Sequence, residues 1–356
     1  MSILVQHANR LLDVYSNYPV GRYVGLIVVR KTESEVLFRT EGAGEDLTKE
    51  FVHAGVTNDA PIFRAVMTKR KQTAVERRTG RELLREHQRL YSKQGNGAIC
   101  SLNTGTSCER CIDCMVYGYA VGGGGAQKSR VLTEDAYSLL PTTVVAGKRT
   151  GNAPYDDGTM RHPETNQPSQ AIFTDPYVKP ETHFLEVQTL KDVTLGELVY
   201  AVGNLLRSTR YGAVSSRQGR MKNRLAAIVF SDCEIFSTLE LTQQVYDRLK
   251  PQEAELDFPL RDTDIVRATW EATQTLLGKV WGLEPVTLGP GDAARVEQEI
   301  GRIYRSRKRV ESLLSLTERG YNTDRTAAHA AHNELVALLE QVASESNGQE
   351  EPHAGD

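Results

Sequence analysis

Residues 184–206 read FLEVQTLKDVTLGELVYAVGNLL, a strand pattern followed at once by a helix pattern. Residues 184–189 predict the strand. Thr194-x-x-Glu197 is a capping box, in which the two side chains satisfy backbone N–H groups at the start of a helix. The apolar residues that follow recur at helical spacing and form one stripe: Leu195, Leu198, Val199, Val202, Leu205 and Leu206. This segment therefore predicts a strand that leads directly into an amphipathic helix.

The same alternation continues on the C-terminal side. Residues 225–230 predict the next strand, and Ser237-x-x-Glu240 predicts the start of a helix that runs to about Leu249. Residues 292–343 read as helical, and the residues after them are too polar to order.

On the N-terminal side, residues 23–30 and 36–39 predict a strand pair. Residues 61–91 predict helices inserted between core strands, and residues 143–146 predict a further strand. The predicted order is a strand, a long connection, a second strand, a helix, a third strand and a second helix. This order is typical of an open α+β sandwich with helices on one face of the sheet.

Length and composition exclude several classes of protein. The chain has 356 residues, beyond the roughly 150 of one ordinary domain, so we expect several units or one domain with large insertions. The longest apolar run, 23–29, is far shorter than the roughly 20 residues of a membrane helix, and no signal peptide is evident. We therefore expect a cytoplasmic protein without a membrane partner.

Basic residues gather in three runs, although the formal net charge is only −3. Residues 69–89 hold eight basic and three acidic residues, and residues 207–224 and 302–309 hold six and five basic residues with no acid. Any one run could be a solvated helix face. Three runs together, with arginine preferred over lysine in the last two, favour binding to the phosphates of a nucleic acid. Tyr211 and Tyr304 lie among these arginines and could offer a ring to a base.

Four of the five cysteines lie within residues 98–118, which read AICSLNTGTSCERCIDCMVYG. Cys100, Cys108, Cys111 and Cys114 follow a C-x7-C-x2-C-x2-C spacing that could close a tetrahedral zinc site of structural type. An iron–sulfur cluster is the alternative, but its usual run continues with x3-Cys-Pro, which is lacking here. The fifth, Cys233, is predicted to be an inert buried thiol.

Two stretches between these features are rich in turn formers. Gly122–Gly125 precede Gln127-Lys128-Ser129-Arg130 without the register of a P-loop, so we interpret them as a flexible connector. The polar stretch between the strands at 143–146 and 184–189 is either a long projecting hairpin or a disordered loop. It contains five of the thirteen prolines: Pro154, Pro163, Pro168, Pro176 and Pro180.

An ordered set of motifs resembles one protein family. The cysteine cluster is followed by Tyr117-Gly118, the glycines, QKSRV at 127–131, DAYSLLP at 135–141 and RYGAVSSR at 210–217. This set is similar to the backbone subunit of the type I-D CRISPR surveillance complex, Cascade, and the resemblance covers residues 20–247.

The resemblance implies a palm that is similar to an RNA-recognition motif, with a ferredoxin-like α+β fold and several insertions. Its parts would be the discontinuous palm (1–44, 130–147 and 184–289), a basic helical or lid insertion (45–95), a zinc-binding insertion (96–129), a thumb hairpin (148–183), C-terminal helices (290–343) and a disordered tail (344–356).

The resemblance also implies partners: guide CRISPR RNA, a target DNA or RNA strand paired with that guide, other Cascade subunits, and copies of the chain itself in a filament that serves antiviral defence. With the basic runs, it predicts an RNA-binding set of Arg22, Lys69, Arg70, Lys71, Arg77, Arg78, Lys128, Arg130, Arg207, Arg210, Tyr211, Arg217, Arg220 and Lys222. The aromatic-rich strand signature of ordinary RNA-recognition motifs is absent, so recognition should rest on phosphate and shape.

The family comparison leaves an enzymatic alternative open. Related backbone subunits of other CRISPR types cut the target strand with an acidic residue on a loop after the first strand, and Glu33, Glu35 and Asp46 lie in that vicinity. These residues could form a metal-dependent nuclease site or could be ordinary surface acids. The leading prediction is a non-catalytic subunit that contains structural zinc.

Overall fold

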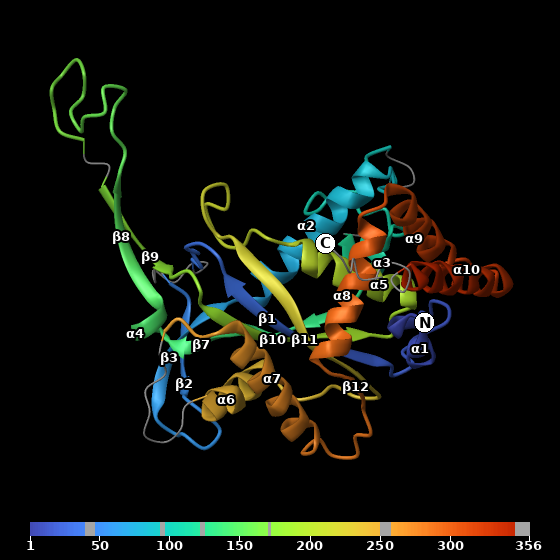
Figure 1. Ribbon diagram of the computed structural model, residues 1–356. Helices are drawn as coiled ribbons and strands as arrows, with labels where there is room; N and C mark the ends of the chain where they lie inside the picture. The colour runs from blue at the N-terminus through green and yellow to red at the C-terminus, as the bar shows by residue number, and fades with distance from the viewer. Residues whose placement is uncertain (40–46, 93–96, 122–124, 170–171, 250–257, 346–356) are drawn as a thin grey trace, which may run out of the picture.

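The computed structural model describes residues 1–39, 47–92, 97–121, 125–169, 172–249 and 258–345 (Figure 1). Its centre is an antiparallel sheet in which β1 (Tyr23–Thr32) lies between β10 (His183–Lys191) and β11 (Met221–Ser231). In this register Ile27 lies opposite Val187 on one side and Ala227 on the other. Within the described residues the sheet has eight strands in the order β12-β11-β1-β10-β7-β3-β2, with β6 also paired to β10.

The outer strands of this sheet are shorter. They are β2 (Lys49–His53), β3 (Pro61–Met67), β6 (Val131–Thr133), β7 (Ala136–Pro141) and β12 (Val286–Leu288). The short strands β4 (Tyr119–Val121) and β5 (Gly125–Gln127) pair with each other, apart from the main sheet.

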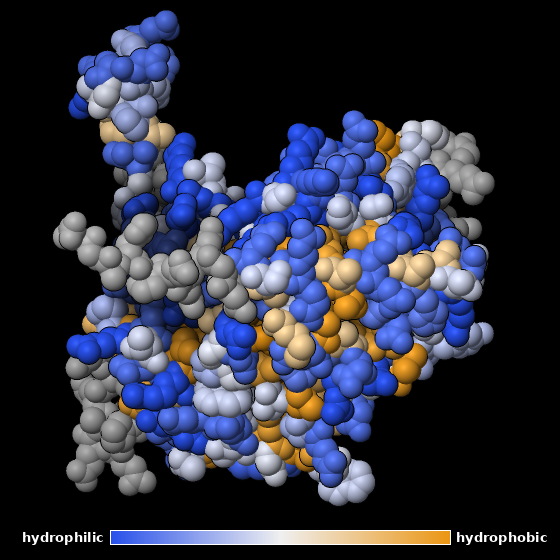
Figure 2. All heavy atoms as spheres, turned by 45° about the vertical axis from the view of Figure 1, so that its right-hand side comes forward, coloured by the Kyte–Doolittle hydropathy of each residue, from blue (hydrophilic) through white to orange (hydrophobic). Residues whose placement is uncertain are grey.

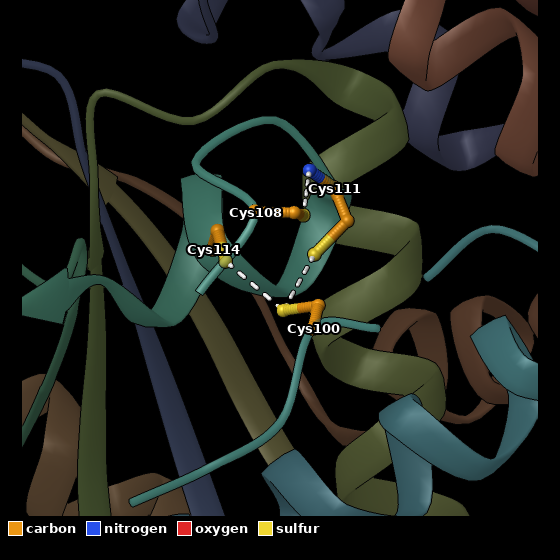
Figure 3. Close-up of side chains that lie close together, drawn as sticks. All are labelled: Cys100, Cys108, Cys111 and Cys114. Atoms are coloured by element: carbon orange, nitrogen blue, oxygen red, sulfur yellow. Dashed lines mark hydrogen bonds between the residues drawn. The ribbon is translucent and has the colours of Figure 1, made fainter. Parts of the chain in front are cut away.

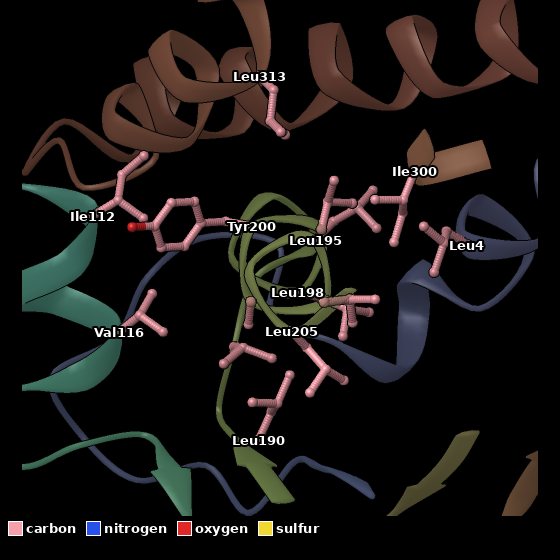
Figure 4. Close-up of a cluster of buried hydrophobic side chains, with 14 of the residues drawn as sticks. Leu4, Ile112, Val116, Leu190, Leu195, Leu198, Tyr200, Leu205, Ile300 and Leu313 are labelled. Carbon is pink, nitrogen blue, oxygen red and sulfur yellow. The ribbon is translucent and has the colours of Figure 1, made fainter. Parts of the chain in front are cut away.

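Helices cover both faces of the sheet, whereas the sequence predicted one covered face. Leu26 and Val28 enter a core with α5 (Leu195–Arg207), the C-terminal helices and the end of α2 (Lys69–Glu86). Figure 4 shows the part of this core around α5. Ile27 and Val29 enter a second core with α6 (Thr238–Leu249) and α7 (Asp262–Leu277). Because the central strands are buried on both sides, both of their faces require apolar cover.

The remaining helices complete these layers. They are α1 (Ile3–Gln6), the 3-10 turn Ala8–Arg10, α2 (Lys69–Glu86), α3 (Ile112–Tyr117), α4 (Thr142–Val145), α8 (Pro290–Tyr304), α9 (Arg307–Arg319) and α10 (Arg325–Ser344). Among the described residues, no helix combines the length and apolar character needed to cross a membrane.

Two helix starts predicted from capping motifs are confirmed. The Thr194 backbone N–H donates to the Glu197 carboxylate at 2.8 Å, while the Glu197 backbone N–H donates to Thr194 Oγ1 at 3.5 Å. At α6, the Glu240 N–H donates to Ser237 Oγ at 3.1 Å. Both motifs act within four consecutive residues, which is why they can be recognised in the sequence.

Other local predictions are wrong. Residues 61–67 form strand β3, and only Lys69–Glu86 of the predicted helical stretch is helix α2. Residues 36–39 do not pair with β1, because β10 and β11 already occupy both of its edges. Val36 and Leu37 instead make isolated bridges to Val178 and Ala213. The expected strand at 143–146 is mostly helix α4.

A two-stranded ribbon projects from the body of the protein (Figure 1). It consists of β8 (Ala146–Asn152) and β9 (Ile172–Val178), which pair antiparallel within the segment predicted as a thumb. Backbone hydrogen bonds of 3.1 and 2.8 Å between Val36 and Val178 attach its base to the body. On the face seen in Figure 2, the end of the projection carries mostly hydrophilic side chains. Gly122–Gly124, Asp46 and residues 346–356 of the predicted tail lie outside the described residues, whereas Ser344 of that tail is the last residue of α10.

Candidate nucleic-acid interface and metal centre

The arginine loop, residues 208–220, is anchored at its base. The Tyr211 N–H donates to the Gly219 carbonyl at 2.9 Å, and the Gly219 N–H donates to the Glu35 carbonyl at 2.7 Å. Gly219 has φ +85°, and a Cβ at this position would lie only 2.1 Å from the Tyr211 carbonyl oxygen. Glycine is therefore required at position 219, and its backbone conformation holds the base of the loop in place.

Tyr211 is fully buried beneath this loop, so the prediction that it offers its ring to a base is wrong for this structure. Its hydroxyl accepts hydrogen bonds from Arg30 Nη1 at 2.9 Å and from Asn223 Nδ2 at 2.8 Å. Burial raises the pKa of Tyr211 to about 12, so the hydroxyl keeps its proton. The ring is an anchor for the loop.

Arg30 is the centre of this buried network, and sequence reasoning missed it. Its guanidinium contacts Glu76 of α2 at 2.7 Å and, through Nε at 2.5 Å, Glu186 of β10, and all three side chains are fully buried. Burial raises the pKa of Glu186 to about 7, against the opposing effect of Arg30. Polar residues in an otherwise apolar central strand, Glu186 and Gln188, were the signal that could have revealed the network.

Three of the predicted RNA-binding residues line one cavity of about 470 Å³ between α5, β11 and α8: Arg207, Arg220 and Lys222. All three are exposed. Arg207 lies over the ring of Tyr304, with its Cζ 5.3 Å from the centroid, so this ring faces an arginine. Arg220 Nε contacts Glu33 at 2.9 Å. In the described part of the chain, no carboxylate lies within ion-pair distance of Arg207 or Lys222.

The neighbouring cavity, here called the ribbon groove, has a volume of about 910 Å³. It lies between the base of the ribbon and the arginine loop, and Arg217 lines it together with Arg39 and Arg149. Sequence reasoning missed the last two, because they lie outside the three basic runs. The two cavities share the arginine loop and the 33–35 turn, so the exposed arginines of this loop face adjoining hollows.

Other predicted RNA-binding residues lie farther along the surface. Lys69 is exposed at the start of α2, 3.7 Å from Asp135, and Lys71 donates to the Arg39 carbonyl at the edge of the ribbon groove. Arg22 Nη1 donates to the Asn9 carbonyl at 3.1 Å. Arg70, Arg78, Lys128 and Arg210 are also exposed.

Arg77 and Arg130 bind partners inside the protein, which corrects the prediction that they contact RNA. Arg77 binds Asp113 through two hydrogen bonds of 2.9 and 3.0 Å and the Gly118 carbonyl at 2.7 Å. Arg130 is buried between Glu197 and the backbone carbonyl of Met115. A guanidinium with a buried carboxylate and carbonyl partners is held in place, and neither residue belongs with the exposed set.

The four cysteine sulfur atoms lie within 4.8 Å of one another, and all four residues are buried (Figure 3). Cys100 Sγ is 3.7 Å from Cys114 Sγ and 4.0 Å from Cys111 Sγ. Tetrahedral zinc with bonds of about 2.3 Å would place its sulfur ligands roughly 3.8 Å apart. Four thiolates this close together repel one another, so they need a cation between them. These residues could hold a metal ion such as zinc.

The cysteine segment, residues 98–118, is part of the main core of the protein. Ile112 and Val116 are fully buried and face Tyr200 of α5 (Figure 4). Arg81 from α2 donates to Asp113 at 2.5 Å and to the Cys100 carbonyl at 2.6 Å. The segment is thus tied to two helices independently of a metal.

Two of the three acidic residues named for a nuclease contact arginines. Glu33 pairs with Arg220, and Glu35 pairs with Arg149. Among the described residues, the group that could hold a metal ion is the four cysteines. Cys233, predicted to be buried, is partly exposed.

A protein-family model described as Csc2 Crispr matches residues 10–314. The chain belongs to the Csc2 CRISPR family. The match extends beyond the 20–247 range of the resemblance found in the motifs. In this Csc2 family member, the arginine loop and the cysteine segment both lie inside the matched range, and α10 lies beyond it.

One solved structure of the same family shares this fold. The crystal structure of Csc2 from Thermofilum pendens is similar at a TM-score of 0.54 and 16% identity, over 95% of each chain. A chain of a "CRISPR RNA-guided surveillance complex, pre-nicking" gives a TM-score of 0.46 and 9% identity, over 78% of this chain and 99% of that chain. Comparison with curated proteins finds no match.

Proposed function

We propose that this Csc2 family member is the subunit that polymerises along guide RNA in a type I-D CRISPR surveillance complex and presents that RNA to invading nucleic acid. The observation that carries the proposal is the exposure of five basic side chains around one anchored loop: Arg207, Arg210, Arg217, Arg220 and Lys222. Membership of the CRISPR family supports the same role.

The strand order supports a palm similar to an RNA-recognition motif. The order β11-β1-β10-β7 is antiparallel throughout, with α2 between β1 and β7 in the chain and α5 between β10 and β11. This is the β-α-β-β-α-β arrangement of the ferredoxin-like fold. The ribbon would be the thumb, and the cysteine segment would be an insertion of this palm.

The chemistry of the exposed residues favours a grip that is independent of sequence. Guanidinium groups bind phosphate oxygens through two parallel hydrogen bonds, and every nucleotide carries the same phosphate. Tyr211 is buried, which leaves phosphate and shape as the features to recognise. Specificity then comes from pairing between the guide and its target, which the subunit leaves accessible.

Zinc is the metal that we propose for the four cysteines. A four-thiolate site has no open position for water or substrate, so its role is to hold the cysteine segment together. The rival iron–sulfur cluster would give visible absorption, which zinc lacks. Metal analysis and an absorption spectrum of the purified protein distinguish the two.

The proposed RNA binding is tested with a fluorescently labelled single-stranded RNA over a series of salt concentrations. Changing Arg210→Gln together with Lys222→Gln should make the slope of log affinity against log salt less steep by about 1.4, because two phosphate contacts are lost. The effect should be equal for RNAs of unrelated sequence. Lys279→Gln, an exposed lysine between α7 and β12, is the control. A wild-type slope near zero, or a loss confined to some sequences, would contradict phosphate binding.

A further inference from the structure

The ribbon groove contains two arginine–carboxylate pairs that face its interior. Arg39 Nη2 donates to both carboxylate oxygens of Asp175, at 2.9 and 2.8 Å. Arg149 pairs with Glu35 in the same cavity. Both arginine side chains are more than half exposed, at 52% and 56%, so solvent reaches them.

These four residues come from three segments that the fold brings together. Arg149 and Asp175 lie on opposite strands of the ribbon, whereas Glu35 and Arg39 follow β1. Each ion pair therefore spans from the ribbon to the body of the protein. Opening the pairs would free two guanidinium groups on facing walls of one groove.

The other walls of the groove carry an aromatic ring and an exposed apolar side chain. Tyr177 lines it with a ring seated against Gly147, where a Cβ would lie 2.6 Å from the ring. Val214, on the opposite wall, is 44% exposed and has φ +53°, which is rare for a β-branched residue. Such strain is retained where the surrounding structure imposes it, often at binding sites. The volume of about 910 Å³ is at the upper end of the range for ligand sites.

We propose that the ribbon groove is a second RNA-phosphate site, in which Asp175 and Glu35 hold Arg39 and Arg149 in the free subunit until RNA phosphates displace these carboxylates. The inference rests on the proposed function, because it requires that the chain binds RNA. Exposed ion pairs contribute little stability, so their exchange costs little. A phosphate offers the same pair of acceptor oxygens as the carboxylate that it replaces. Glu33 and Arg220 form a similar pair, 2.9 Å apart, in the adjoining cavity.

If RNA phosphates displace the two carboxylates, removing negative charge from the groove should tighten RNA binding. In the full chain with Glu35→Gln and Asp175→Asn, labelled single-stranded RNA should bind up to about fivefold more tightly for each substitution, because no carboxylate has to be displaced. Glu334→Gln is the matched control, since Arg319 and Glu334 form an exposed two-bond pair of 2.7 and 2.9 Å between α9 and α10. This control should leave RNA affinity unchanged.

A second variant removes the positive charges of Arg39 and Arg149 and should weaken RNA binding. Arg39→Gln with Arg149→Gln should make the log affinity against log salt slope less steep by about 1.4. Unchanged or weaker binding by the amide variant, or an unchanged slope in the arginine variant, would overturn the inference. If only the Arg210 and Lys222 variant loses affinity, the proposed function stands and the ribbon groove is not an RNA site. If wild-type protein does not bind RNA, both are refuted.

Discussion

Asp113→Ala is the substitution with the largest effect that we expect on folding. The Asp113 side chain is fully buried and accepts hydrogen bonds from Arg77 at 2.9 and 3.0 Å and from Arg81 at 2.5 Å. The Arg81 side chain is only 4% exposed, so removal of the carboxylate leaves a buried cation without its partner. Breaking a buried ion pair in this way costs about 3–5 kcal/mol. The total free energy of unfolding of a domain is about 5–15 kcal/mol, so the loss is a large fraction of it.

Urea unfolding followed by far-ultraviolet circular dichroism measures this loss, and metal content measured on the same samples reports on the cysteine cluster. Arg81 also donates to the Cys100 carbonyl, so the variant should bind metal more weakly. Asp264→Ala is the control, because Asp264 and Arg267 form an exposed pair 2.9 Å apart on α7. It should cost less than about 1 kcal/mol. If Asp113→Ala costs no more than this control, the cysteine segment is not held by α2 and our account of it is wrong.

Three further predictions follow from the buried groups, the cysteines and the arginine loop. The folded state raises the pKa of Glu186 to about 7, so the contribution of Glu186 to the free energy of unfolding should fall as pH rises from about 4.5 to about 7. Urea unfolding curves at a series of pH values measure this fall, and Glu186→Gln should make the free energy of unfolding less dependent on pH over that range. Chelation of the metal should expose the four thiols to a thiol reagent and lower the unfolding temperature, whereas equal rates of thiol reaction with and without chelator would argue against a metal site. Gly219→Ala should destabilise the protein by about 1–3 kcal/mol, since the added Cβ meets the Tyr211 carbonyl at 2.1 Å. Gly291→Ala, where a Cβ meets no atom within 4 Å, should be close to neutral in the same unfolding assay.

Features set by a few consecutive residues could be predicted from the sequence. The capping box of Thr194 and Glu197 satisfies backbone groups within one helical turn, so its pattern is sufficient to locate the start of α5. The cysteine spacing likewise brings four sulfur atoms together within one short segment. Motifs spread along the chain indicated the CRISPR family, because their order is a property of the sequence itself.

The direction in which each basic side chain points could not be predicted from charge alone. Arg77 and Arg78 are neighbours in one basic run, yet Arg77 binds a buried aspartate and Arg78 is exposed, because neighbouring helix residues point about 100° apart. The family resemblance predicts a phosphate contact at Arg130, but Glu197, 67 residues away, determines the position of this side chain.

Short stretches of sequence were enough to predict the helix caps, the amphipathic stripe of α5, the metal-type cysteine cluster and the family. Three-dimensional contacts were needed to show that helices cover both faces of the sheet and that Arg30 organises a buried network under the arginine loop. The same holds for the pairs of Arg39 with Asp175 and of Arg149 with Glu35 across a groove. These contacts join residues far apart in the chain, and they depend on strand register and on which faces of the strands and helices are buried. A pattern of neighbouring residues does not contain that information.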